Sequence, residues 1–315
     1  MTLLRSSLLL RRLALASLIA NIGIVGTGGA VRLSGSGLGC PTWPKCDDGS
    51  YVPTGAAGIH GTIEFTNRTL TFVVGILAVA CVIAAWFQPR TRTRGKQLFW
   101  SVAVFLGIPL QAVIGGITVL TDLNPWVVCL HFLGSMAVIA AAYMLWIWTR
   151  DPVPAPATHP MIRSLVWVIV GVTVVVLAVG TVVTGSGPHA GDAKAKRTGL
   201  DPGMIAQLHT DLVMLLIGLS LAAWFALMAT GAARRTANAA AILVVIEAAQ
   251  ALIGFVQYFT HLPAVLVGLH LLGAALVWFG VLTLLNAVRP VNLLEQGDQS
   301  VGEPTGSTVA VLQKQ

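Results

Sequence analysis

The feature that most constrains this chain is a series of eight long apolar stretches separated by short polar ones. They lie at about residues 11–31, 65–87, 98–120, 126–148, 164–184, 205–230, 239–259 and 264–286. A helix that crosses a bilayer needs about 20 mostly apolar residues, and each stretch reaches that length. With 56% hydrophobic and 10% charged residues, the chain is too apolar for a soluble globular protein. The sequence therefore predicts an all-α integral membrane protein with eight transmembrane helices.

Basic residues predict the orientation and the location of the chain. Thirteen of the 19 Lys and Arg residues fall in segments on the same side as the N-terminus. Because basic loops stay on the cytoplasmic side, both termini are expected in the cytoplasm, in a bacterial plasma membrane. The basic residues of these cytoplasmic segments then account for the net charge of +7. The lipid bilayer is the expected partner, and no nucleic acid is.

An internal duplication divides the apolar part of the chain into two halves. The segment "QAVIGG" at 111–116 recurs as "QALIGF" at 250–255, and "LHFLG" at 130–134 recurs as "LHLLG" at 269–273, both at an offset of 139 residues (250 − 111). An even number of helices per repeat makes the repeats parallel. We therefore expect two parallel-repeat four-helix bundles.

These bundles predict the domain organisation. The N-terminal bundle covers residues 1–150 and the C-terminal bundle covers residues 164–290. A proline-rich cytoplasmic linker, 151–163, joins them, and a polar tail, 291–315, is expected to be disordered and cytoplasmic.

Four histidines lie at the outer ends of even-numbered apolar stretches: His60 just before the second, His131 in the fourth, His209 in the sixth and His270 in the eighth. Ionisable side chains in membrane helices are costly and usually mark sites in the bundle interior. Two imidazoles facing each other suit the axial positions of a haem iron, whereas zinc needs three or four ligands. The sequence predicts one haem site per bundle, side by side near the outer face. A core histidine without a ligand is the alternative for each position.

A carboxylate accompanies the histidines only in the first half. In "HGTIEFTNR", His60, Glu64 and Arg68 are spaced by four residues, which places them on one helical face. Glu64 is the candidate catalytic residue, because an acid that only one of the two halves carries indicates a site built for chemistry in that half. The alternative role is a salt bridge to Arg68, and Arg68 can also be shared with a haem propionate. Glu247, in the seventh stretch, is expected to hydrogen-bond between helices.

The first outer loop contains a cysteine pair in "CPTWPKC". If it faces an oxidising compartment, Cys40 and Cys46 form a disulfide; free thiols or an incomplete metal site are the alternatives. Trp43, near the outer boundary, is expected to be an interfacial anchor. Asn124 and Pro125 are expected to cap the fourth helix.

Over about residues 10–290, the chain resembles the haem A synthase family. The matching segments are "GGAVRLSGSGLGCPTWPKC", "IEFTNR", "QAVIGGITVLT", "TGSGPHAGD" and "LHLLGA". The resemblance implies two bundles of four helices with a haem-binding histidine pair in each. It also implies that the ring methyl of haem O is oxidised through a hydroxymethyl intermediate to the formyl group of haem A, which supplies terminal oxidases. A haem O synthase is then a possible partner.

The resemblance also assigns roles to residues. His209 and His270 would hold a haem b cofactor, and His131 would be a ligand of the substrate haem. Glu64 would act beside the reacting haem. The pair of Cys40 and Cys46 would take part in electron delivery.

One position departs from the family pattern. The usual Glu-x-x-His-Arg reads Glu-Phe-Thr-Asn-Arg here, so Asn67 stands where a ligand is expected, and the duplication pairs it with His209. His60 is the candidate replacement ligand of the substrate haem, although seven residues place it about 10 Å further out along a helix. The alternative is an iron without a second strong ligand, with His60 as a proton carrier or a propionate contact.

Two other functions are compatible with paired histidines. A bis-haem b electron-transfer cytochrome without catalysis needs no Glu64 and favours one haem near each membrane face. A transporter built from parallel repeats would use the histidines to line a substrate path. A haem-modifying oxidoreductase accounts for more of the sequence than either alternative.

Overall fold

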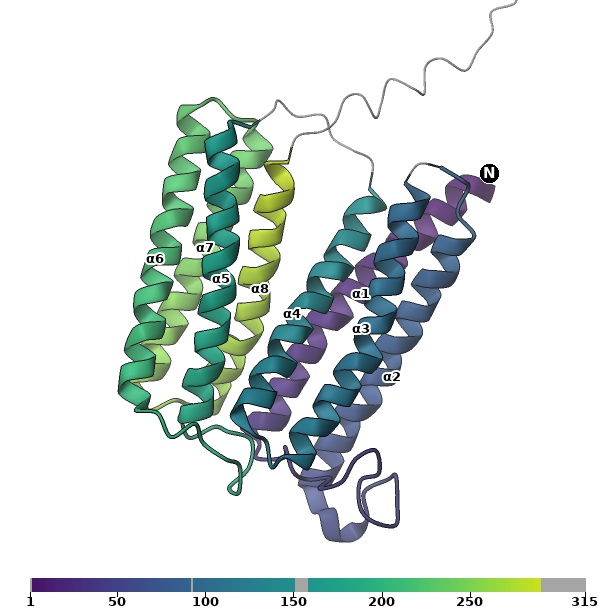
Figure 1. The fold of residues 1–315 in the computed structure, drawn as a ribbon, viewed down its shortest axis with the longest axis vertical. Helices are drawn as coiled ribbons and strands as arrows, with labels where there is room; N and C mark the ends of the chain where they lie inside the picture. Colours follow the sequence, from purple (N-terminus) through teal and green to yellow (C-terminus); the bar gives the residue numbers. More distant parts are fainter. Residues whose placement is uncertain (1, 92, 151–157, 290–315) are drawn as a thin grey trace, which may run out of the picture.

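A computed structural model of the protein describes residues 2–91, 93–150 and 158–289. Within these residues the chain forms eight α-helices and one short 3-10 helix. They are α1 (Thr2–Leu33), η1 (Gly55–Ala57), α2 (Gly58–Trp86), α3 (Arg94–Leu120), α4 (Pro125–Trp148), α5 (Pro160–Ser186), α6 (Pro202–Ala229), α7 (Arg234–Phe259) and α8 (Ala264–Ala287). Each α-helix is long and apolar enough to cross a membrane. The predicted all-α fold with eight such segments is confirmed (Figure 1).

The start of α2 differs from the sequence prediction. The apolar stretch begins near residue 65, whereas α2 begins at Gly58. The first turns of α2 contain glycine and exposed polar residues, so hydropathy alone does not detect them. As a result, His60 lies in the first turn of the helix and not in the loop before it.

Three helices begin at a proline that follows a capping side chain. Asn124 accepts a hydrogen bond from the backbone N–H of Trp126 at 3.0 Å, which confirms the predicted cap of α4. The caps of α5 and α6 are His159 and Asp201. A proline at the first helical position has no N–H to leave unpaired, so each of these helices has a defined starting residue.

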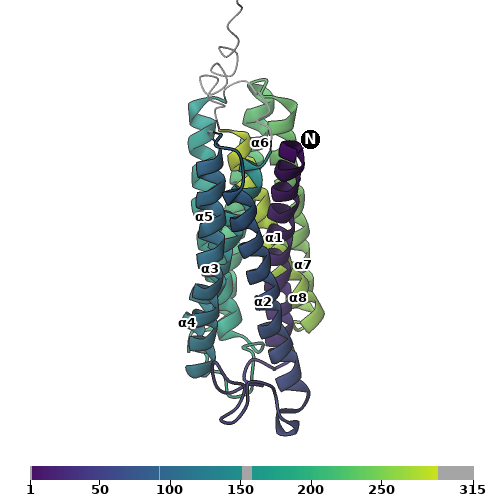
Figure 2. The ribbon, with the colours of Figure 1, turned by 90° about the vertical axis from the view of Figure 1, so that its right-hand side faces the viewer.

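The helices are arranged as two four-helix bundles (Figures 1 and 2). In the first bundle, α1 packs against α2 and α4, and α3 packs against the same two helices. In the second, α5 and α7 pack in the same way against α6 and α8. Within the described residues, α2 and α4 lie diagonally across their bundle without packing directly against each other, and so do α6 and α8.

The two bundles meet along α1, α4, α5 and α8. The indole Nε1–H of Trp278 on α8 donates to the carbonyl of Met136 on α4 at 2.9 Å, in the buried interior. Tyr143 on α4 makes an edge-to-face contact with Phe279 on α8, with ring centroids 5.6 Å apart. A buried indole N–H needs a partner, so this bond favours the packing that brings α4 and α8 together.

One end of the molecule holds the longest connections, and we call it the loop-rich end: residues 34–57, 121–124, 187–201 and 260–263. Helix α1 begins at the opposite end, and α2, α4, α6 and α8 all begin at the loop-rich end (Figure 1). The same turn recurs there in both bundles, because Asp122, Leu123, His261 and Leu262 all have positive φ. The duplication itself stays a sequence prediction. Most of the predicted linker, 151–157, and the predicted tail, from residue 290 on, lie outside the described residues.

Candidate functional site

A cavity of about 480 Å³ lies inside the first bundle, toward the loop-rich end. We call it the first cavity. Its wall is mostly apolar, and the larger polar side chains on it are Asn21, Arg32, Glu64, Asn67, Arg68, Gln111 and His131. Pockets of about 300–1,000 Å³ with a few polar groups are typical of sites for cofactor-sized molecules.

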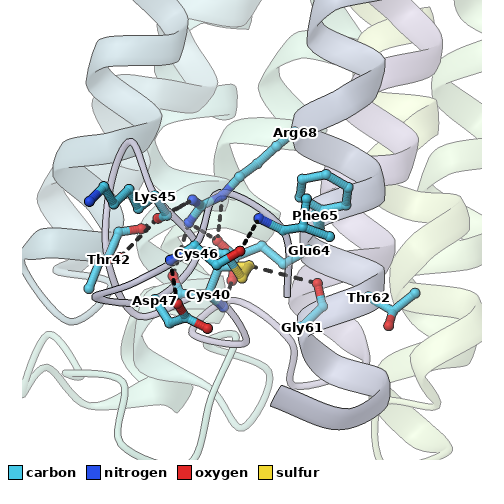
Figure 3. The surroundings of a disulfide bond; sticks show 12 residues. Cys40, Thr42, Lys45, Cys46, Asp47, Gly61, Thr62, Glu64, Phe65 and Arg68 are labelled. Carbon is cyan, nitrogen blue, oxygen red and sulfur yellow. Dashed lines mark hydrogen bonds and ion pairs between the residues drawn. A yellow bond between two sulfur atoms is a disulfide. The ribbon is translucent and has the colours of Figure 1, made fainter. Parts of the chain in front are cut away.

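Glu64 lies on α2 at the point where the cavity meets the loop of residues 40–46. Its side chain is buried, with 5% of the residue exposed. Carboxylate Oε2 accepts the backbone N–H of Cys40 at 2.7 Å, and Oε1 accepts hydrogen bonds from Arg68 one helical turn later (Figure 3). The predicted pairing of Glu64 with Arg68 is present, and both carboxylate oxygens have partners.

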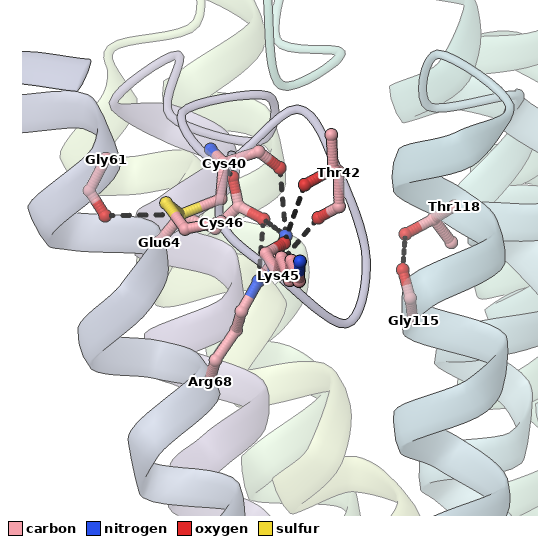
Figure 4. A network of polar contacts seen from close by, with 9 residues as sticks. All are labelled: Cys40, Thr42, Lys45, Cys46, Gly61, Glu64, Arg68, Gly115 and Thr118. Atoms are coloured by element: carbon pink, nitrogen blue, oxygen red, sulfur yellow. Dashed lines mark hydrogen bonds and ion pairs between the residues drawn. A yellow bond between two sulfur atoms is a disulfide. The ribbon is translucent and has the colours of Figure 1, made fainter. Parts of the chain in front are cut away.

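Arg68 ties α2 to the same loop. Its Nη1 donates to the carbonyls of Thr42 and Lys45 at 3.1 Å each, and its Nη2 donates to the carbonyl of Cys40 at 2.9 Å. Nε and Nη2 also donate to Oε1 of Glu64 (Figure 4). A guanidinium has five N–H donors, so all five are used within the protein. A propionate could reach Arg68 only by displacing one of these bonds, and that predicted contact stays a prediction.

The loop is closed by the disulfide between Cys40 and Cys46, which confirms the predicted pairing. Both residues are buried. Between them, Trp43 lies on the cavity wall while 36% of the residue is exposed, so its predicted role as an interfacial anchor stays a prediction. It packs so closely on α3 that a Cβ at Gly116 would lie 2.4 Å from the indole ring. The loop is therefore part of the cavity wall.

His131, on α4, also faces the first cavity. It lies against α3, where a Cβ at Gly115 would be 3.2 Å from the imidazole. Its Nδ1 atom is buried and has no hydrogen-bond partner among the described residues. In Figure 4, Gly115 lies on α3, opposite the helix that carries Glu64 and Arg68.

A second cavity, of about 430 Å³, lies inside the second bundle and is lined by both His209 and His270. We call it the second cavity. The two imidazole centres are 6.4 Å apart, and both Nδ1 atoms are buried without a partner in the described part of the chain. A metal–imidazole bond of about 2 Å on each side requires ring centres about 6 Å apart. The diagonal pair thus fits the two axial positions of a haem iron.

Acidic and amide side chains lie deeper in the second cavity. Oε1 of Glu247 on α7 accepts the hydroxyl of Ser220 on α6 at 2.9 Å, which confirms the predicted interhelical hydrogen bond. Oε2 of Glu247 and Oε1 of Gln250 are buried, and neither has a partner among the described residues.

The two cavities are neighbours. Phe132, Thr181, Thr184 and Leu271 line both of them, so only single side chains separate the two spaces. Electron transfer between groups bound in the two cavities would be short-range. Both spaces lie toward the loop-rich end, where α2, α4, α6 and α8 begin.

A family model described as cytochrome oxidase assembly protein (COX15-CtaA) matches residues 11–191 of this chain, more than half of its length. The chain belongs to this family. Membership and the eight apolar helices together make it a multi-pass membrane protein related to haem A synthases.

Several proteins similar to this chain are named heme A synthase. That of Alkalihalophilus pseudofirmus is 33% identical over 141 residues, 44% of this chain and 46% of that protein. That of Exiguobacterium sibiricum is 28% identical over 165 residues, 50% and 52% of the two chains. That of Listeria welshimeri is 32% identical over 123 residues, 39% of each. The chain thus spans about half or less of the length of these relatives.

Within this family member, His60 lies apart from both cavities. It is exposed, it does not belong to either cavity wall, and its Nδ1 is 2.9 Å from the hydroxyl of Ser36. Helix α2 runs without interruption from Gly58, so no bend brings His60 inward. This placement counts against the predicted ligation of the substrate haem by His60.

Asn67 lies on the first cavity's wall. Its Oδ1 accepts the hydroxyl of Thr27 on α1 at 2.7 Å. Thr27 has no special role in the sequence pattern, and only the packing of α1 on α2 brings it to this position.

Sequence reasoning missed Arg32, which follows the first apolar stretch in "GGAVRLSGSG". It lies on the first cavity's wall, and its Nε donates to the carbonyl of His189 at 2.7 Å. In the described part of the chain its two Nη groups make no hydrogen bond. Its position could have marked it as a site residue, because a charged side chain in the last turn of a membrane helix costs free energy unless it has a partner.

Proposed function

We propose that the chain is a haem A synthase. It oxidises the ring methyl of haem O to a hydroxymethyl group and then to a formyl group, in two two-electron steps at the same carbon, with loss of water from the gem-diol. Haem O is the substrate, and haem b is the cofactor. The relatives named heme A synthase support this function, and so does the presence in each bundle of a mostly apolar cavity lined by histidine.

One observation carries the proposal: a cavity with His131 and the buried Glu64 directly adjoins a cavity with a diagonal histidine pair. A protein that only transferred electrons would need two histidine pairs and no carboxylate. The asymmetry supports a division of work, in which the half at residues 1–150 binds the substrate and the half at residues 164–290 binds the cofactor.

In the substrate cavity, His131 is the proposed ligand of the haem O iron. Glu64 is the proposed catalytic residue beside the methyl group. Its two oxygens are held by Cys40 and Arg68, so its position is set before the substrate arrives. Preorganised charge near a carbon that becomes positive lowers the barrier, and the same carboxylate accepts a proton released there.

In the cofactor cavity, His209 and His270 are the proposed ligands of haem b. When bound, haem b supplies one-electron transfer. The chain's own contribution is to hold the two imidazoles at the right separation and to exclude water with an apolar wall. The shared wall of the two cavities supports transfer over a short distance.

The proposal includes a location and a partner. The loop-rich end, with its buried disulfide, faces the outside of a bacterial plasma membrane, and both termini lie in the cytoplasm. Haem O is too apolar to move freely through water, so a haem O synthase in the same membrane is the proposed source of substrate.

The test is to express the full chain together with a haem O synthase in a host that makes no haem A. Membrane haems are then extracted and separated by chromatography. Haem A, or its hydroxymethyl intermediate, is the expected product. Unconverted haem O in membranes that contain the folded, haem-loaded chain would overturn the proposal.

A further inference from the structure

Among the described residues that line the first cavity, only His131 has an imidazole, thiol, thioether or phenol side chain. These are the groups that usually bind a haem iron in proteins. We infer that the iron in this cavity is bound by His131 alone, and that its other face, beside Asn67, is open to small exogenous ligands. This inference rests on the proposed function, because it requires a haem in the first cavity.

The two bundles place corresponding residues in corresponding surroundings. His131 lies against Gly115 of α3, and His270 lies against Gly254 of α7. One turn further along, Gln111 packs on Gly134 and Gln250 packs on Gly273. Each residue of these contacts in the first bundle has its counterpart 139 positions later in the second. The packing of α3 on α4 is therefore repeated locally in the packing of α7 on α8.

In each bundle, the residue that faces His131 or His270 across the cavity comes from the helix that lies diagonally opposite. In the second bundle this helix is α6, and it supplies His209, whose ring faces His270. In the first bundle it is α2, and the residue on the cavity wall is Asn67, 142 positions before His209 (209 − 67). The first cavity therefore has an amide where the second has an imidazole.

Asn67 is a poor replacement for a histidine ligand. Its amide oxygen, the only atom that could bind iron, already accepts the Thr27 hydroxyl at 2.7 Å. Asn67 is on the cavity wall, and its Nδ2 hydrogens have no partner in the described part of the chain, so they are free to donate there. Hydrogen-bond donors beside an open iron face favour the binding of small ligands.

Two other residues could in principle fill the open position. Seven residues of helix place His60 about 10 Å from Asn67 along α2, and it is exposed and bonded to Ser36. Glu64 is on the wall, but its oxygens are held by Cys40 and Arg68. Neither residue is available to the iron without loss of these contacts.

The test uses the full chain, purified in detergent and titrated with haem O until uptake stops. The ferric protein is examined by electron paramagnetic resonance, and the reduced protein is exposed to carbon monoxide. We expect two haems per chain, of which one is high-spin and binds carbon monoxide while the other stays low-spin and inert. Two inert low-spin haems would overturn the inference.

Three variants test which residue leaves one face of the iron in the first cavity open. Asn67→His should remove carbon monoxide binding and convert the high-spin signal to a low-spin one. His209→Asn, the matched change in the other bundle, should double carbon monoxide binding. His60→Ala should leave it unchanged, whereas a gain of binding on that substitution would identify His60 as a ligand. Because the wild-type spectra already decide the question, a variant that does not fold leaves the test intact.

Failure of this inference differs from failure of the proposed function. A chain that makes haem A but binds no carbon monoxide retains the function and loses the open iron face. A chain that takes up only one haem and makes no haem A loses both.

Discussion

The backbone N–H of Cys40 donates to Oε2 of Glu64 at 2.7 Å, across 24 residues of sequence. Cys40 is half of the disulfide, and Glu64 is on the wall of the first cavity. The disulfide loop therefore contacts the carboxylate directly through this bond, and indirectly through Arg68, which binds both the carbonyl of Cys40 and Oε1 of Glu64.

Replacement of Cys40 or Cys46 by serine should loosen this loop and displace Glu64. For so short a loop, the chain-entropy model gives a loss of about 2 kcal/mol in the free energy of unfolding. We expect a lower thermal midpoint in detergent and reduced haem A formation. Cys81→Ala removes a buried thiol outside the loop and should retain activity. Equal activity of the serine variants and the wild type would show that Glu64 is held without the disulfide.

Glu64→Gln should retain the shape of the site and lose its charge. If the carboxylate stabilises positive charge at the reacting carbon, haem A formation should fall on the order of 10²-fold. The haem content of the purified protein should not change, because Glu64 is not a proposed iron ligand. A variant with wild-type turnover would leave Glu64 with the structural role of anchoring Arg68.

Arg32→Gln should weaken the binding of haem O. Arg32 and Arg68 are the only cations on the first cavity's wall among the described residues, and all five donors of Arg68 are used. A charge-assisted bond to a propionate contributes about 1.5–3 kcal/mol, so we expect affinity to fall roughly 10- to 100-fold in a haem titration. Arg197→Gln, an arginine of the same loop-rich end that is absent from the wall, is the control. Equal losses in both variants would point to a general effect of charge.

Asp47→Asn should change the pH dependence of the disulfide loop. Hydrogen bonds hold the pKa of Asp47 below its usual range, first from the Thr54 side chain and then from the backbone N–H groups of Gly49 and Ser50. A lowered pKa in the folded state stabilises the loop above the ordinary carboxylate range, and this contribution is lost as pH falls through the folded value. Hydrogen exchange at Gly49 and Ser50 should therefore be faster in the variant at neutral pH, and the difference should vanish in acid. The neighbouring Asp48→Asn, which makes the same change of charge, is the control; equal changes in exchange in both variants would contradict a specific role of Asp47.

Several features of this protein were predictable because they depend on short stretches of sequence. Hydropathy over about 20 residues is a local property, so the eight helices could be counted before their packing was known. The pair of Glu64 and Arg68 follows from i,i+4 spacing on one helix. Cys40 and Cys46 are six residues apart, so closing the loop between them costs little conformational entropy.

The start of α2 shows where local reasoning stops. Hydropathy detects the part of a helix that is apolar throughout, and the first turns of α2, with two glycines, His60 and Glu64, carry no such signal. The structure extends the helix through His60 and so moves its imidazole away from the cavity.

The sequence by itself determined the number of helices and the residues worth considering, which are the cysteine pair and the four histidines. Only the tertiary structure decided that Cys40 and Cys46 are paired, and that Asn67 shares a cavity with His131 while His60 lies outside both cavities. It also decided that Arg68 is fully occupied by loop carbonyls, that Thr27 holds Asn67, and that Arg32 reaches the first cavity. The physical reason is that these relationships join different helices, and the rotation and depth of each helix are set by packing against its neighbours.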